Sequence, residues 1–101
     1  MELVLPPSVS ERQRRDLGAF ARYCARRIER ELGTTERWSV TLSAGAGIQY
    51  ASSVSVPDAH GPIVGRGGSA DAVLAIWEAM CQLEQRLREH LATTRMPAPA
   101  A

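Results

Sequence analysis

Hydrophobic residues recur at helical spacing in two long segments of the chain. Within residues 10–32, apolar side chains at every third or fourth position share one face of a helix; they are Leu17, Phe20, Ala21, Cys24, Ile28 and Leu32. Residues 69–92 carry a second set with the same spacing, made up of Val73, Ile76, Trp77, Met80, Leu83, Leu87 and Leu91. The pattern predicts two amphipathic helices, each with one buried face.

The residues at the ends of these segments favour helix caps. Ser8 and Ser10 each precede a glutamate or glutamine by three positions, so either serine can form a capping box. Gly33 follows the last apolar position and can adopt the left-handed conformation that ends many helices. Ser69 is expected to cap the second helix, with an acidic residue following in the first turn.

Between and before the helices, apolar and polar residues alternate as they do in half-buried strands. We expect strands at residues 3–5, 38–42, 48–56 and 63–64, with a turn at 44–47. Ser52 interrupts the apolar side of the third strand. The resulting order of elements is β-α-β-β-β-α.

This order predicts an α+β fold, with the two helices packed on one face of a small antiparallel sheet in a double-stranded-RNA-binding-like topology. Residues 1–93 are expected to form a single domain, because a chain of 101 residues has room for one core. Residues 94–101 are rich in proline and alanine and are expected to form a flexible C-terminal tail.

Composition places the chain among ordinary globular proteins, since 45% of its residues are hydrophobic and 23% are charged. No apolar run approaches the roughly 20 residues that span a bilayer, and the N-terminal residues lack the features of a signal peptide. We therefore expect a soluble cytoplasmic protein without a membrane partner.

Residue types that carry catalysis or bind metals occur singly. Cys24 and Cys81 stand in apolar helical context and are expected to be buried thiols. His60 and His90 are expected to be exposed, and neither has a cysteine or acid at ligand spacing. Without a nucleophile paired with a base, the sequence predicts no enzyme, no metal and no cofactor.

The basic residues form the most unusual pattern, because all twelve are arginine. On the first helix they gather opposite the apolar face, at Arg12, Arg15, Arg22, Arg26 and Arg30, with Tyr23 beside them. Two interpretations are open. A compositional bias can turn a solvated lysine face into arginine, or the guanidinium groups can form a stripe that binds phosphate.

A second candidate for phosphate binding is the glycine-rich segment at residues 65–69, which precedes the last helix. It lacks the Gly-Lys-Ser/Thr of a Walker A loop. The simpler interpretation is a flexible turn between strand and helix, in which Arg66 can still reach a phosphate.

Residues 71–76 read Asp-Ala-Val-Leu-Ala-Ile, and residues 82–87 read Gln-Leu-Glu-Gln-Arg-Leu at matching spacing. With the β-α-β-β-β-α order, they resemble the hibernation-promoting-factor family, also called ribosome-associated inhibitor A, in its short form. Its members typically have Asp-x-x-x-Ala-Ile at the start of the last helix and Lys-Leu-Glu-Arg-Gln-Leu near its end. The resemblance implies a stress-response factor that binds the small ribosomal subunit and its 16S rRNA and silences translation.

If the function follows this resemblance, basic residues on the helices contact rRNA phosphates. The candidate RNA-binding residues are Arg22, Arg26, Arg27 and Arg30 on the first helix, Arg86 and Arg88 on the last helix, and Arg66 before it.

An alternative function follows from positions that depart from the family pattern. Gln82, Gln85 and Glu89 stand where basic residues are usual. A non-catalytic adaptor or inhibitor could keep the same fold without RNA affinity. The apolar band with Trp77 and Met80 would then bind a protein partner or a second copy of the chain; otherwise it is core.

Overall fold

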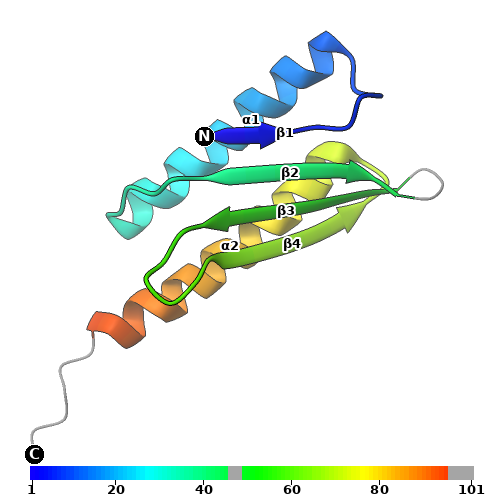
Figure 1. Cartoon of the computed structure of the whole chain (residues 1–101). Helices are drawn as coiled ribbons and strands as arrows, with labels where there is room; N and C mark the ends of the chain where they lie inside the picture. The colour runs from blue at the N-terminus through cyan, green and yellow to red at the C-terminus, as the bar shows by residue number, and fades with distance from the viewer. Residues whose placement is uncertain (46–48, 96–101) are drawn as a thin grey trace, which may run out of the picture.

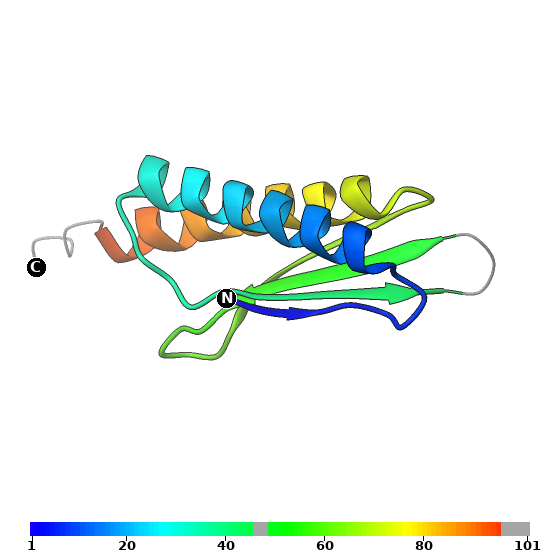
Figure 2. The same cartoon turned by 90° about the horizontal axis from the view of Figure 1, so that it is seen from above.

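The computed structural model describes residues 1–45 and 49–95. Within them the elements follow the order β1 (Glu2–Val4), α1 (Glu11–Leu32), β2 (Ser39–Ala44), β3 (Tyr50–Val56), β4 (Ile63–Ser69) and α2 (Ala72–Arg95). The two helices lie side by side in one layer that covers one face of the sheet (Figure 2). The predicted α+β fold and element order are confirmed.

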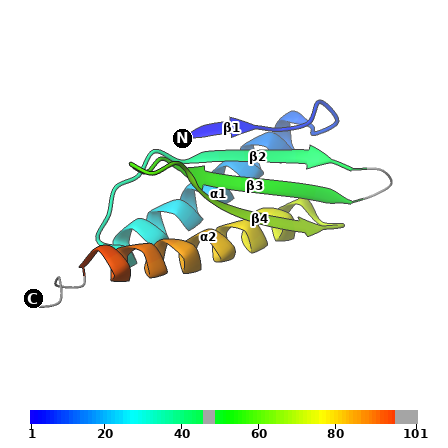
Figure 3. The same cartoon turned by 60° about the horizontal axis from the view of Figure 1, so that its bottom comes forward.

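The four strands lie in the order β1-β2-β3-β4 (Figure 1 and Figure 3). β2 pairs with β3, and β3 with β4, in antiparallel register. β1 instead pairs with β2 in parallel, so the expectation of a wholly antiparallel sheet is corrected. The reason is topological: α1 carries the chain back to the end of the sheet where β1 began, so β2 runs in the same direction as β1.

Local sequence explains the ends of α1. The backbone N–H of Gln13 donates to Ser10 Oγ at 3.2 Å, and the N–H of Ser10 donates to Gln13 Oε1 at 2.9 Å, which completes a capping box. Gly33 ends the helix in the left-handed region, at φ 66°. Of the two serines proposed as caps, Ser10 is therefore the one used.

The N-terminus of α2 is capped by Asp71 rather than by the predicted Ser69. The Asp71 carboxylate accepts the backbone N–H groups of Val73 at 2.8 Å and Leu74 at 3.3 Å. Ser69 is the last residue of β4, and its hydroxyl accepts the N–H of Asp71. The cap shifts because the strand extends farther than the sequence pattern indicated.

This extension corrects the interpretation of residues 65–69 as a turn, because they form most of β4. Gly65 and Gly67 face α2, and a Cβ on either would overlap its backbone: Gly65 at the Ala79 carbonyl oxygen, and Gly67 at 2.6 Å from that of Ala75. The two glycines therefore let α2 lie directly against the strand.

The core lies between the helices and the sheet and contains Ile28, Val54, Ile76 and Leu83, each fully buried. Trp77 was expected to join them, but 40% of its surface is exposed. Cys24 is buried as predicted, whereas Cys81 is exposed. The exposure of Trp77 and that of Cys81 have the same cause. The small residues of α2 face the glycines of β4, and in this orientation of the helix positions 77 and 81 face solvent.

Two polar side chains complete the packing. Ser52, the residue that interrupts β3, is buried, and its hydroxyl donates to the Thr41 carbonyl oxygen at 3.1 Å. His90 was expected to be exposed; it is half-buried, with Nε2 lying 3.0 Å from Asp58 Oδ1 in the loop between β3 and β4. This contact joins the C-terminal part of α2 to the loop between β3 and β4.

α2 continues to Arg95, so the first two residues of the predicted C-terminal tail at 94–101 are helical. The remaining residues of that predicted tail, residues 46–47 of the predicted turn and residue 48 of the predicted third strand lie outside the described residues. Neither helix combines the length and apolar character needed to cross a membrane in the part of the chain that the structure describes.

Candidate nucleic-acid interface

α1 presents a basic surface on the side opposite its buried residues. Arg22, Arg26 and Arg30 follow one another at intervals of four, which stacks them along one face of the helix. All three side chains are exposed, and within residues 1–45 and 49–95 none of them takes part in an ion pair. Their charges are therefore available to a partner.

These arginines surround a shallow depression on α1. Its lining consists of Ala19, Arg22, Tyr23, Arg26, Arg27 and Arg30, which we call the arginine surface. Tyr23 is 62% exposed, the largest exposed fraction among the large apolar and aromatic residues in the described part of the chain. The sequence had indicated the arginines but gave Tyr23 no role.

Arg27 differs from its neighbours because it forms ion pairs with carboxylates on both helices. Its guanidinium lies 3.2 Å from the Glu31 carboxylate and 3.0 Å from the Glu84 carboxylate, and its Cζ lies 5.8 Å from the centre of the Trp77 ring. Desolvation alone would lower the pKa of Arg27, but the carboxylates of Glu84 and Glu31 outweigh it, and the pKa is raised.

Arg88 completes this cluster from α2. Its Nη2 lies 2.9 Å from Glu31 and 2.9 Å from Glu84. Two arginines and two carboxylates thus bridge the helices, and Glu84 is the least exposed of the four side chains. The cluster gives Arg27 and Arg88 a structural role in holding α1 against α2.

Arg66 and Arg86 lie away from the arginine surface. Arg86 Nη1 donates to the Val64 carbonyl oxygen at 2.8 Å, and Gln82 Oε1 accepts the backbone N–H of Arg66 at 2.7 Å. Both contacts cover the outer edge of β4. Because Gly65 and Gly67 face α2, the alternation along the strand directs the Arg66 side chain to the uncovered face of the sheet.

The structure thus brings together only part of the predicted RNA-binding set. Arg22, Arg26, Arg27 and Arg30 share one depression. Arg88 is linked to Arg27 through the carboxylates of Glu31 and Glu84, which both arginines contact. Arg66 lies on β4, and Arg86 reaches from α2 to the outer edge of that strand.

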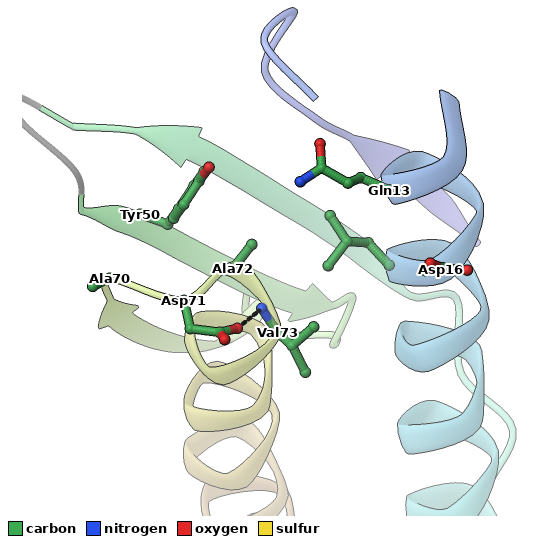
Figure 4. Close-up of a pocket in the computed structure, with 8 residues that line it drawn as sticks. Gln13, Asp16, Tyr50, Ala70, Asp71, Ala72 and Val73 are labelled. Atoms are coloured by element: carbon green, nitrogen blue, oxygen red, sulfur yellow. Dashed lines mark hydrogen bonds between the residues drawn. The ribbon is translucent and has the colours of Figure 1, made fainter. Parts of the chain in front are cut away.

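A different depression lies between the N-termini of the two helices, beside Tyr50 (Figure 4). Asp16 and Asp71 line it, and no arginine of the described residues does. The Asp71 carboxylate already occupies the first backbone N–H groups of α2, the groups that would otherwise bind an anion. The phosphate cradle considered for the glycine-rich segment is therefore contradicted.

The cysteines do not add a reactive site. Desolvation in the core raises the pKa of the Cys24 thiol, and partial desolvation together with Glu84 raises the pKa of the exposed Cys81 thiol. Both shifts favour the protonated thiol, which is a poor nucleophile. Across residues 1–45 and 49–95, no group of three or more metal-binding side chains converges.

No protein-family model matches the chain. No curated protein matches its sequence either.

Solved structures do match. A ribosomal subunit interface protein from Coxiella burnetii is 14% identical, with a TM-score of 0.71 over 90% of this chain and 96% of that one. The N-terminal domain of Protein Y from Thermus thermophilus is 18% identical, with a TM-score of 0.65 over 88% of this chain and 94% of that one. The resemblance seen in the sequence is thus confirmed at the level of the fold, which this chain shares with both over nearly its whole length.

Proposed function

We propose that this protein is a ribosome-associated translation inhibitor, a hibernation factor that binds the small ribosomal subunit through phosphates of 16S rRNA. The observation that carries the proposal is the exposed row of Arg22, Arg26 and Arg30, which has no carboxylate partner among the described residues. The proposal is also supported by the fold, which this chain shares with a ribosomal subunit interface protein and a Protein Y domain.

The physical argument starts from the rigidity of α1. The helix is anchored by Leu17, Cys24 and Ile28, so the opposite face presents its arginines in a row along a rigid backbone. Planar guanidinium groups bind phosphate oxygens through paired hydrogen bonds. Binding to a structured RNA depends largely on such phosphate contacts and on shape. The function proposed is binding and occlusion, without catalysis.

A protein-binding adaptor remains the second candidate function. The observation in its favour is the exposed apolar group on α2, formed by Val73, Leu74 and Trp77. An adaptor of this kind would bind its partner with little dependence on salt, whereas binding to RNA weakens steeply as salt increases.

The proposal is tested by pelleting small ribosomal subunits with the full chain. We expect the triple change Arg22→Glu, Arg26→Glu, Arg30→Glu to abolish co-sedimentation and to relieve inhibition of translation in a cell-free extract. Circular dichroism should show an intact fold, because these residues lie opposite the core.

A matched control for the double change Arg22→Glu, Arg26→Glu is Arg14→Glu, Arg37→Glu, which changes the net charge equally at exposed positions outside the arginine surface. We expect this variant to pellet as the parent does. If the two variants behave alike, total charge rather than the arginine surface determines binding. If the parent does not pellet at low salt, the adaptor function is favoured.

A further inference from the structure

We infer that Tyr23 is a stacking platform for one unpaired RNA base, whose flanking phosphates are held by the arginines around it. The inference rests on the proposed function and adds the class of ligand: single-stranded or looped-out RNA rather than continuous duplex.

The first observation is the exposure of the ring. A tyrosine that is 62% exposed at the middle of a helix buries little of its apolar surface in the fold. Its hydroxyl has no hydrogen-bond partner, and no aromatic ring packs against it, among the residues described. The ring therefore contributes little to stability, and both its apolar faces and its polar tip remain open.

The second observation is the room beside the ring. Side chains on a helix lean toward its N-terminus, so Tyr23 extends over the preceding turn, where Ala19 lies. Ala19 also lines the depression, and its methyl group takes up little of that space. A longer side chain at this position would occupy the place of a stacked base.

The third observation is the charge around this space. Arg22, Arg26 and Arg30 line the same depression as Tyr23 and are the arginines there without a carboxylate partner among the described residues. A flat aromatic ring among cations suits a nucleotide, because the ring takes the base while the guanidinium groups take the phosphates. An apolar peptide segment would bury these charges without a partner, which is costly.

Stacking on neighbouring base pairs covers the faces of the bases in a duplex, so a stacking residue of this kind distinguishes unpaired from paired RNA. Since every base has an aromatic face, the site would tolerate different sequences. The arginines supply affinity for any RNA backbone, and Tyr23 supplies the preference for an unpaired segment.

The experiment uses the full chain and two probes: a short fluorescein-labelled single-stranded RNA of mixed sequence, and the same strand annealed to its complement. Fluorescence anisotropy over a range of KCl concentrations gives affinity and salt slope for each. Tyr23→Ala should bind the single strand roughly 10-fold more weakly. Its salt slope and its affinity for the duplex should equal those of the parent, since no charge is lost.

Two further variants sharpen the test. Tyr23→Phe keeps the ring and should bind the single strand as the parent does. Ala19→Leu keeps Tyr23 but fills the depression; it should weaken binding to the single strand as Tyr23→Ala does. Leucine is a good helix former at this exposed position, so the fold should be unaffected.

Equal affinity of Tyr23→Ala and the parent for the single strand would overturn the inference, while the proposed function would stand if the arginine variants still lost ribosome binding. Loss of affinity for both probes to the same extent would also overturn it, because the ring would then not distinguish unpaired RNA. If the parent pellets with subunits, binds neither probe, and loses pelleting in Tyr23→Ala, the depression contacts a ribosomal protein and the inference fails.

Discussion

Single residues determine how closely α2 packs against the sheet. We expect Gly65→Ala to lower the free energy of unfolding by at least about 2 kcal/mol, because the added methyl group meets backbone atoms at Ala79 and Leu83 that cannot rotate away. The lower entropy of alanine in the unfolded chain offsets less than about 1 kcal/mol of this cost. Urea denaturation monitored by circular dichroism measures the change.

Gly68→Ala is the matched control in the same strand. A Cβ at Gly68 would come no closer than 3.5 Å to its nearest neighbour, the Tyr50 carbonyl oxygen. We expect its free energy of unfolding to stay within about 0.5 kcal/mol of the parent. Equal destabilisation by the two substitutions would mean that loss of glycine flexibility, rather than the contact with α2, explains the effect.

The same contact explains which buried residues could be predicted. Periodicity in α2 correctly identified Ile76, Met80 and Leu83 as core. It also assigned Trp77 to the core, because residue size and hydropathy favour burial of tryptophan. The face that α2 buries is set by Gly65 and Gly67, which lie in another strand, and a pattern local to the helix does not contain that information.

Among the elements, α1 and β4 show the two extremes of predictability. α1 has its capping box, its apolar stripe and its terminal glycine in its own sequence, and the structure uses each of them. β4 has three glycines and a serine in seven residues, a composition poor in strand-forming residues. It forms a strand because β3 pairs with it along its whole length, a tertiary effect that outweighs local preference.

The outer edge of β4 carries its own protection. Gln82 and Arg86 reach from α2 to the backbone of Arg66 and Val64, so polar groups that could pair with another strand are occupied. We expect the double change Gln82→Ala, Arg86→Ala to expose this edge and to produce dimers or larger species at high concentration. Size-exclusion chromatography with light scattering measures the molar mass.

Gln85→Ala is the control for this prediction, since Gln85 is exposed on the same helix and makes no hydrogen bond through its side chain among the described residues. It should remain monomeric wherever the parent does. A monomeric double variant at every concentration would show that the short strand resists pairing without help from α2.

In the whole molecule, the arginines fall into groups with different surroundings. Arg27 and Arg88 meet carboxylates from the other helix, and the Arg27–Glu84 pair joins positions 57 residues apart in sequence. Arg22, Arg26 and Arg30 meet none in the described part of the chain. Sequence spacing predicted that basic residues line one face of α1. The spacing did not distinguish the arginines that pair with carboxylates from those that do not, because the carboxylate partners lie on a helix far away in the sequence.

This separation yields a prediction for two single substitutions, each removing one positive charge from an exposed side chain. Arg26→Gln should lower the salt slope of binding to single-stranded RNA by roughly one unit, because one phosphate contact is lost. Its melting temperature should not change.

Arg88→Gln should leave the salt slope unchanged and lower the free energy of unfolding by about 0.5 kcal/mol. The loss is small because solvent screens an ion pair whose arginine is 49% exposed. Anisotropy titrations at several KCl concentrations and thermal melts, made on the same samples, would measure both quantities. Equal reductions in salt slope would show that Arg88 leaves its carboxylates to bind RNA, and the inter-helix cluster would then be part of the interface.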